Sequence, residues 1–228
     1  MHGFLKKNLY VLCNYIMSFR VLLKKEIEKG LPGTEVQWAL ASSDRMIKNF
    51  PRVPRPDSSV AAVLILLYPE NGKVHTIFIQ RPEYDGVHGG QISFPGGKQE
   101  ADDTDLVYTA LREASEETGI RKEDVELIGI LTPLYIPVSN IVVTPVVGWL
   151  YKKPVLVAEK SEVEFIIEAD IESFLDYSII KVRPYEIRGE KIDIRYFDYN
   201  GHVIWGATAM MFHELLTIIK RANLSSQQ

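Results

Sequence analysis

The sequence holds a single cysteine, Cys13, among 228 residues. One thiol cannot close an internal disulfide, and no Cys and His residues stand at the spacing of a zinc site, which excludes disulfide-stapled and zinc-stapled scaffolds. No apolar run approaches the roughly 18 residues that a membrane-spanning helix needs. The apolar stretch at residues 9–17 is broken by Asn14 and lacks a small-residue cleavage site, so we expect neither a signal peptide nor a membrane span. We therefore expect a cytoplasmic protein.

An excess of charge of one sign is also missing, because 26 Lys and Arg stand against 30 Asp and Glu. With 46% hydrophobic and 25% charged residues, the composition is that of a globular chain rather than a disordered one. The charge is unevenly spread: residues 1–56 carry ten Lys and Arg and four Asp and Glu, whereas residues 57–228 carry 16 and 26. The basic segment alternates charged with apolar residues and lacks regularly spaced aromatic side chains, so we expect it to pack rather than to bind nucleic acid.

Hydrophobic spacing divides the chain into two parts. It predicts an amphipathic helix over residues 17–29, and the proline-rich residues 49–59 predict an extended linker. We therefore separate an N-terminal helical extension with its linker, residues 1–57, from a main domain, residues 58–228. In the main domain, strands are expected at residues 60–68, 73–80, 125–135, 140–150, 179–185 and 191–199, and helices at 104–118 and 207–221.

The helix expected at residues 104–118 carries a cluster of acids. At about 100° per residue, Glu113, Glu116 and Glu117 fall on one side, and Glu117 intrudes into the apolar stripe that contains Ala110. Like charges at i, i+3 and i+4 repel one another unless a cation neutralises them. Oxygen ligands without His or Cys select Mg²⁺ or Mn²⁺, which also bind substrate phosphates. The pattern therefore indicates a metal site for phosphate chemistry.

For a bare Arg-Glu-x-x-Glu-Glu, an ordinary charged helix face would be the better explanation. Two further features favour the metal site. Gly96 and Gly97 lie upstream, and paired glycines let the backbone approach a metal or a phosphate closely. Gly119 then stops the helix directly after the acids.

These residues resemble a Nudix box, whose pattern is G, five residues, E, seven residues, then R-E-U-x-E-E-x-G-U, where U is aliphatic. Residues 112–120 read Arg-Glu-Ala-Ser-Glu-Glu-Thr-Gly-Ile and match the second half. In the first half, counted from Gly97, Asp103 stands where the pattern has Glu, and eight residues separate it from Arg112. The chain is thus identified as a member of the Nudix family with a box one residue longer.

The opening of the box, Phe94-Pro95-Gly96-Gly97, is similar to that of the Nudix subfamily that hydrolyses coenzyme A and its thioesters. Arg81 and Gly90 agree with the upstream signature of that subfamily, whereas Ile79, Pro82 and Gly86 depart from it. The resemblance implies an α/β fold, an α/β/α sandwich with a mixed β-sheet in which the box forms a loop, a helix and a loop.

The same resemblance implies a role for each matching residue. Gly97, Glu113, Glu116 and Glu117 would hold Mg²⁺ or Mn²⁺, Arg112 would orient the glutamates, and Arg81 and Gly96 would contact substrate phosphate. Glu116, Glu162 and Glu164 are the candidates for the general base, because Nudix enzymes vary at this point. His88, Asn140, Thr144 and Trp205 are better explained by loop structure, turn formation and packing.

The resemblance implies a pyrophosphatase that cleaves coenzyme A or acyl-coenzyme A to adenosine 3′,5′-bisphosphate and a 4′-phosphopantetheine species. Its partner would be a small nucleoside diphosphate derivative, without nucleic acid or membrane, and a homodimer stays open. One alternative substrate is ADP-ribose or a similar compound. The other alternative is a Nudix-like nucleotide sensor without catalysis, which would be expected to lose the box glutamates that this chain keeps.

Overall fold

The computed structural model describes residues 18–47, 50–83, 89–187 and 189–225. Cys13, Gly86 and His88 lie outside these ranges, so the expectations attached to them stay predictions.

A mixed sheet of eight strands forms the centre of the described chain. Its strands are β1 (Ser59–Glu70), β2 (Lys73–Gln80), β3 (Ile92–Ser93), β4 (Gly96–Lys98), β5 (Glu126–Ile130), β6 (Leu134–Ile136), β7 (Ile141–Trp149) and β8 (Phe165–Asp170). β1 pairs in parallel with β7, and the other pairs are antiparallel. β1 is central because residues 64–68 are all apolar or aromatic and fully buried, as expected for a strand covered on both faces.

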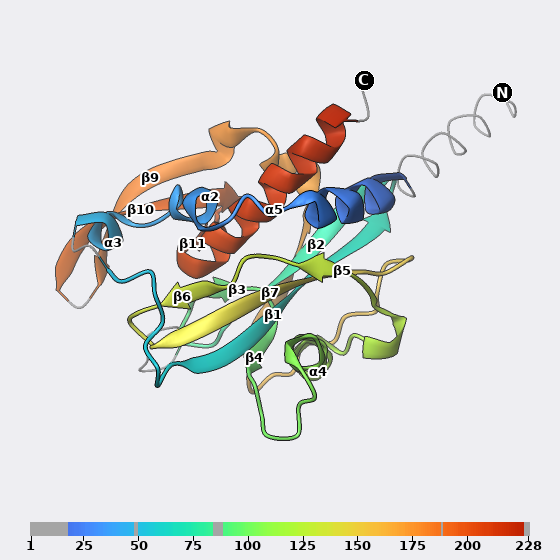
Figure 1. Cartoon of the computed structure of the whole chain (residues 1–228), viewed down its shortest axis with the longest axis horizontal. Helices are drawn as coiled ribbons and strands as arrows, with labels where there is room; N and C mark the ends of the chain where they lie inside the picture. Colours follow the sequence, from blue (N-terminus) through green and yellow to red (C-terminus); the bar gives the residue numbers. More distant parts are fainter. Residues whose placement is uncertain (1–17, 48–49, 84–88, 188, 226–228) are drawn as a thin grey trace, which may run out of the picture.

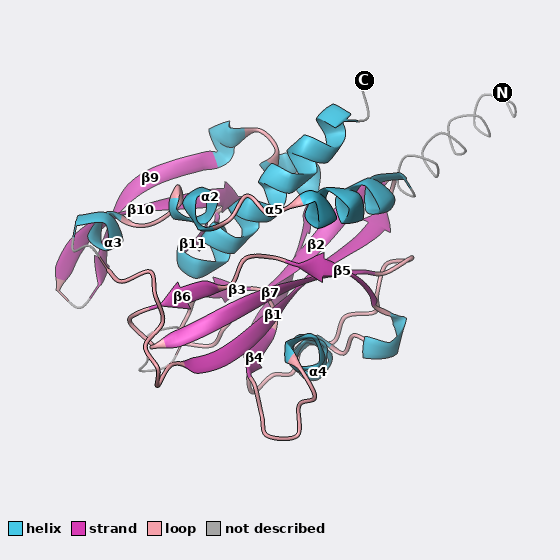
Figure 2. Cartoon of the chain, viewed as in Figure 1, coloured by secondary structure: helices cyan, strands magenta, loops and turns pink. Residues whose placement is uncertain are grey.

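Helices cover both faces of this sheet, as Figures 1 and 2 show. On one face, α4 (Leu106–Thr118) packs Ala110 and Ala114 against Leu64 and Leu66 of β1. On the other face, α5 (Gly206–Ser225) contributes apolar side chains such as Phe212 to the larger core. The predicted α/β/α sandwich with a mixed sheet is confirmed.

The N-terminal residues contribute to the same core. A helix at residues 18–29, α2 (Thr34–Trp38) and α3 (Ser43–Ile47) precede the sheet. Phe19, Leu23 and Trp38 are buried in the cluster that contains Phe212. The predicted N-terminal helix is thus present, and its apolar face packs onto the domain, on the side of the sheet that α5 covers (Figure 1).

A second sheet of three antiparallel strands, which we call the ribbon, lies beside α5 (Figure 1). It consists of β9 (Ile180–Ile187), β10 (Glu190–Tyr199) and β11 (His202–Trp205). Short 3₁₀ turns occur at Lys122–Asp124, Ile171–Phe174 and Tyr177–Ile179. The strand predicted at 125–135 is wrong as one element, because residues 131–133, Leu-Thr-Pro, separate β5 from β6.

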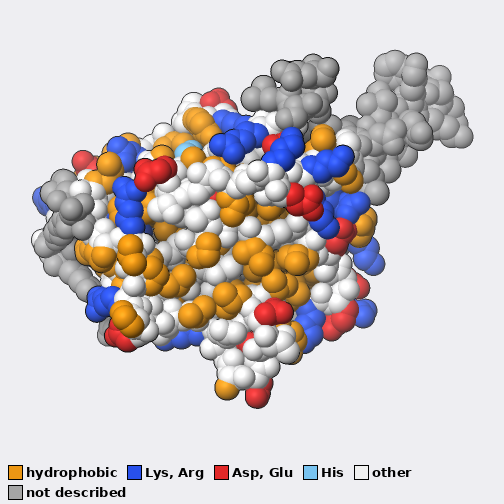
Figure 3. Space-filling view, viewed as in Figure 1, with side chains coloured by type: hydrophobic (Ala, Val, Ile, Leu, Met, Phe, Trp, Pro, Cys, Tyr) orange, Lys and Arg blue, Asp and Glu red, His pale blue; other side chains and the backbone are white. Residues whose placement is uncertain are grey.

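Hydrophobic side chains gather over β1, β5, β6 and β7 on the face seen in Figure 3. β5 lies at one end of the strand order, and its Leu127 and Ile130 are each 42% exposed. Within the described ranges, no helix has both the length and the apolar character needed to cross a bilayer.

Candidate functional site

The helix α4 is fixed at both ends by its own sequence. The side chain of Asp105 accepts a hydrogen bond from Tyr108 N at 2.8 Å, and Gly119 ends the helix with φ of 71°. Asp105, rather than Asp102 or Asp103 further upstream, is therefore the N-cap residue. Asp103 has a different set of partners.

Asp103 binds Arg112 through both carboxylate oxygens, at 2.8 Å from Nε and 3.0 Å from Nη2. Thr109 Oγ1 and Glu100 N donate to the same carboxylate at 2.9 and 3.0 Å. The bonds from Arg112, then those from Glu100 and Thr109, hold the pKa of Asp103 well below its ordinary value. Asp103 therefore fixes the position of the Arg112 guanidinium. Although the box is one residue longer than the family pattern, it still has a carboxylate that pairs with this arginine.

Replacing Asp103 with asparagine should destabilise the protein in a pH-dependent way. A carboxyl whose pKa is lowered by folding stabilises the folded state above its unfolded pKa, and this contribution disappears as the pH falls through the folded pKa. The loss in free energy of unfolding should therefore be constant from neutral pH down to about pH 5 and should shrink below the ordinary value of 3.8. Urea unfolding of both proteins at about pH 7 and about pH 3 measures it. A difference that stays the same at both pH values would contradict the assigned ion pair.

Arg112 connects Asp103 to the acids of α4. Its Nη1 lies 3.0 Å from Glu113 Oε1 and 3.0 Å from Glu116 Oε2, and Nη2 donates to Lys98 O at 3.3 Å. The guanidinium thus sets the positions of Glu113 and Glu116, which supports the expected orienting role. Glu116 is mostly exposed, whereas the Glu113 side chain is only 15% exposed.

Glu117 is the most buried acid of the box, with 1% of its side chain exposed. Its Oε2 accepts a hydrogen bond from Gly96 N at 2.7 Å. Arg81 approaches from the other side: Nη2 lies 3.7 Å from Glu117 Oε1 and donates to Gly96 O at 3.1 Å, and Nε lies 3.3 Å from Ser93 Oγ. Arg81 and Gly96, predicted to contact substrate, here hold Glu117.

The two glycines of the box have separate steric roles. A Cβ at Gly97 would overlap the carboxylate of Glu113, so only glycine lets this acid lie against the β4 backbone. A Cβ at Gly96, whose φ is 153°, would lie 2.6 Å from Val63 Cα in β1. The two glycines thus begin strand β4, which pairs with β1, and they present their backbone to Glu113 and Glu117.

Burial and mutual repulsion act on these acids together. Burial raises the pKa of Glu117 to about 7, and the charges of Glu113 and Glu162 add to the rise, while Arg81 and Gly96 N oppose it. Burial also raises the pKa of Glu113, in the same direction as the charges of Glu116 and Glu162 and against Arg112. The site holds more negative charge than its two arginines balance.

The same electrostatics separates two of the candidates for the general base. Glu162 acts on both Glu113 and Glu117, so its carboxylate lies near the box. Glu164 follows the turn at residues 159–163, and its backbone N–H donates to Gln80 O at 2.9 Å, just before β8.

Over the described residues, no group of three or more His, Cys, Asp or Glu side chains is arranged to hold a metal ion. Glu116 turns toward Arg112, and Glu117 accepts a bond from the backbone. The donor chemistry nevertheless fits a divalent cation. The carboxyl groups of Glu113 and Glu117 have raised pKa values, and the glycine backbone beside them leaves room for their oxygens. A bound cation would relieve the repulsion just described.

Most of the residues predicted for the site lie together, but two features were not predicted, the partners of Asp103 and the cavity at Trp205. By sequence, Asp103 is only a departure from the box pattern. It nevertheless follows Gly97 after five residues, at the position where the pattern has its first glutamate. Asn140, with φ of 49°, bonds Ser58, Tyr135 and Asp57 O, which agrees with a turn role. Trp205, interpreted as packing, lines a cavity together with Arg183.

Comparison with known proteins places this geometry in a family. The NUDIX domain family matches residues 58–164. The chain is 34% identical over 157 residues to the uncharacterized Nudix hydrolase NudL of Citrobacter koseri, covering 68% of this chain and 80% of that protein. A solved Nudix hydrolase from M. smegmatis, RenU, has 14% identity and a TM-score of 0.48, covering 75% of this chain and 87% of that one.

The chain is also 34% identical over 166 residues to the chloroplastic Nudix hydrolase 22 of Arabidopsis thaliana, covering 70% of this chain. It spans about half the length of the plant relatives it matches, 55% for this protein and 54% for the mitochondrial Nudix hydrolase 15. The NUDIX domain match includes the box, and this chain covers 80% of NudL at 34% identity. The chain therefore belongs to the Nudix hydrolase family.

Proposed function

We propose that this chain hydrolyses the pyrophosphate bond of coenzyme A or acyl-coenzyme A, with Mg²⁺ or Mn²⁺, to adenosine 3′,5′-bisphosphate and a 4′-phosphopantetheine species. The proposal rests on one observation: Glu113 and Glu117 both lie against the backbone of Gly96 and Gly97. Its single cysteine suits a reducing compartment, and we propose a cytoplasmic setting.

The chain's own residues would hold the cation as follows. Glu113, Glu117 and the backbone of Gly97 provide oxygen donors, and Glu116 adds a fourth from the surface. When bound, Mg²⁺ or Mn²⁺ would neutralise phosphate charge and lower the pKa of a water. Arg112, itself fixed by Asp103, would hold Glu113 and Glu116 in place as the substrate binds.

Two further groups would act on the substrate side. Arg81 could exchange its 3.7 Å contact with Glu117 for a substrate phosphate oxygen once a cation takes over the charge of Glu117. Glu162 would remove the proton of the attacking water, and we place it ahead of Glu164 because its charge reaches both Glu113 and Glu117. Glu116 is the alternative base.

Incubation with a panel of substrates tests the proposal. Purified protein with Mg²⁺ or Mn²⁺ would be given coenzyme A, acetyl-coenzyme A, ADP-ribose, NADH and dinucleoside polyphosphates, and products would be identified by mass. We expect phosphopantetheine release to be the fastest reaction and a chelator to abolish it. Rapid ADP-ribose cleavage without phosphopantetheine release would overturn the coenzyme A assignment.

A further inference from the structure

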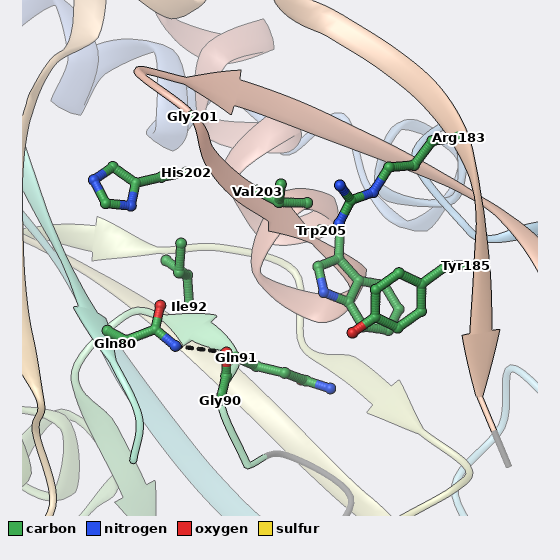
Figure 4. A pocket seen from close by; sticks show the side chains of 10 residues that line it. All are labelled: Gln80, Gly90, Gln91, Ile92, Arg183, Tyr185, Gly201, His202, Val203 and Trp205. Atoms are coloured by element: carbon green, nitrogen blue, oxygen red, sulfur yellow. Dashed lines mark hydrogen bonds between the residues drawn. The ribbon is translucent and has the colours of Figure 1, made fainter. Parts of the chain in front are cut away.

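A small cavity opens where the ribbon meets the edge of the main sheet. Its volume is about 190 Å³, and it is lined by Gln80, Gly90, Gln91, Ile92 and by ribbon residues that include Arg183, Tyr185, His202 and Trp205. In Figure 4 the side chains of Arg183, Tyr185 and Trp205 face those of Gln80 and Gln91 across it. Pockets for whole small molecules run to roughly 300–1,000 Å³, so this cavity suits one part of a ligand.

The ribbon wall combines aromatic rings with a cation. The rings of Tyr185 and Trp205 lie 5.2 Å apart, and the guanidinium of Arg183 lies 5.6 Å from the Tyr185 ring and 5.2 Å from that of Tyr196. Trp205 and Arg183 are only half-buried, so their faces are accessible. Flat aromatic faces beside amide side chains provide stacking and hydrogen bonds, the two interactions by which proteins bind nucleobases.

Arg183 is the unusual member of this wall. Among the described residues, its guanidinium takes part in no ion pair within 4.0 Å, although its charge helps to lower the pKa of Asp198, and its Nε is buried without a hydrogen-bond partner. A buried donor left unpaired is costly unless a ligand supplies the acceptor. Because an arginine held against aromatic rings keeps its edge free for a planar or tetrahedral oxyanion, a phosphate is the group that this position favours.

The cavity connects directly to the box. Gln80 and Ile92, which line it, are partners across β2 and β3, and β3 lies at one end of the strand order. Arg81 and Ser93, the next residues along, contact each other on the face that carries Glu117. Neighbouring residues of a strand point to opposite faces, and packed layers lie about 10 Å apart. The cavity and the box are therefore close enough for one nucleoside diphosphate to span the edge of the sheet. Its base would lie in the cavity and its pyrophosphate at the box.

We infer that this cavity binds the nucleobase of the substrate by stacking on Tyr185 and Trp205, and that Arg183 binds a phosphate on the ribose. The inference rests on the proposed function for the identity of the substrate, in which the ribose carries a 3′-phosphate. It assigns Arg183 and Trp205 to substrate selection, at a distance from the bond that is cleaved.

Initial rates with coenzyme A and dephospho-coenzyme A test this inference in the full chain. Arg183→Gln should raise the KM for coenzyme A about tenfold and leave kcat within about twofold, because the contact is made equally before and during reaction. The KM for dephospho-coenzyme A should not change, so the preference between the two substrates should disappear. A general structural effect would weaken both substrates alike. The exposed Arg121 is the matched control, and Arg121→Gln should change neither KM.

Trp205 tests the stacking separately. Trp205→Leu should raise the KM for both substrates about tenfold, and Trp205→Phe, which keeps a ring, should restore most of the loss. Thermal unfolding of each variant identifies any loss of the fold. The inference would be wrong if Arg183→Gln and a folded Trp205→Leu both turned over coenzyme A with the KM of the unaltered chain.

Failure of the proposed function would be seen differently, as absence of coenzyme A cleavage by the unaltered chain. In that event, calorimetric titration with adenosine 3′,5′-bisphosphate addresses the cavity itself. We expect binding that Arg183→Gln weakens about tenfold. Absence of binding to the unaltered chain, or equal binding to both, would overturn the cavity assignment.

Discussion

Glu117→Gln should lower kcat about a thousandfold and leave the fold intact. The side chain is 1% exposed and accepts a bond from Gly96 N, which the amide oxygen of glutamine can also accept. The change therefore removes the charge and, with it, the ion pair to Arg81. Loss of a buried charged group that acts on the transition state typically costs about 10²–10⁴ in rate.

The matched control is Glu123→Gln, an exposed acid in the turn after the box, which should keep full turnover. Steady-state rates with the best substrate of the panel and thermal unfolding curves would be recorded for all three proteins. Full turnover in Glu117→Gln would show that the metal site lies elsewhere. Isothermal titration with Mn²⁺ should also show weaker binding to Glu117→Gln than to Glu123→Gln.

Glu214→Ala should have the largest effect on stability. The Glu214 side chain is fully buried and accepts four hydrogen bonds, from Gly33 N at 3.0 Å, Gln37 Nε2 at 2.8 Å, Thr132 N at 3.2 Å and Thr132 Oγ1 at 2.6 Å. Alanine removes this acceptor from the half-buried Gly33 and Thr132, whereas Gln37 Nε2 keeps its bond to Thr132 O at 2.7 Å. Each donor left without an acceptor costs about 1–3 kcal/mol. We expect the free energy of unfolding to fall by about 3–5 kcal/mol, a large share of the 5–15 kcal/mol typical of a domain.

Urea unfolding measures this loss, and limited proteolysis should show faster cleavage within residues 30–41, which contain Gly33 and Gln37. Glu214→Gln keeps one acceptor oxygen and should lose less than the alanine variant. Glu123→Ala, with an exposed side chain, should fall within about 0.5 kcal/mol of the unaltered chain. If Glu214→Gln and Glu214→Ala were both as stable as that control, Glu214 would not anchor the N-terminal segment.

The sequence predicts α4 and its acids well because both depend on local spacing. A period of 3.6 residues places Ala110, Ala114 and Glu117 on one side, and all three are buried. Glu116, which the same period places on the side of Glu113 and Glu117, is mostly exposed. The long apolar run of β1 and the alternation in β2 are equally local, and both strands are confirmed within a few residues of the predicted ends.

Contacts between distant residues could not be predicted in this way. Arg81 looked free for substrate, but strand pairing brings it to Gly96 and Glu117, which no spacing in the sequence indicates. Glu162 comes near the box only because the turn before β8 folds back. The cavity depends on the ribbon meeting β2 and β3, so Trp205 looked like an ordinary packing residue.

β8 itself was not predicted. Its residues, Phe-Ile-Ile-Glu-Ala-Asp, are short and flanked by acids, so the alternation is weak. In the folded chain this strand completes the sheet beside β2, with Ile167 and Ala169 buried on one face. Pairing with a formed neighbour, rather than its own propensity, makes it a strand.

The bond between Gly33 and Glu214 joins positions 181 residues apart. Closing a loop of this length costs chain entropy before the contact stabilises anything, which slows folding. During synthesis, Phe19, Leu23 and Trp38 leave the ribosome long before α5, the helix on which their cluster depends. The nascent chain must therefore keep the part of this cluster that α5 covers exposed until its last helix emerges, even where Phe19 already packs against Trp149 of β7.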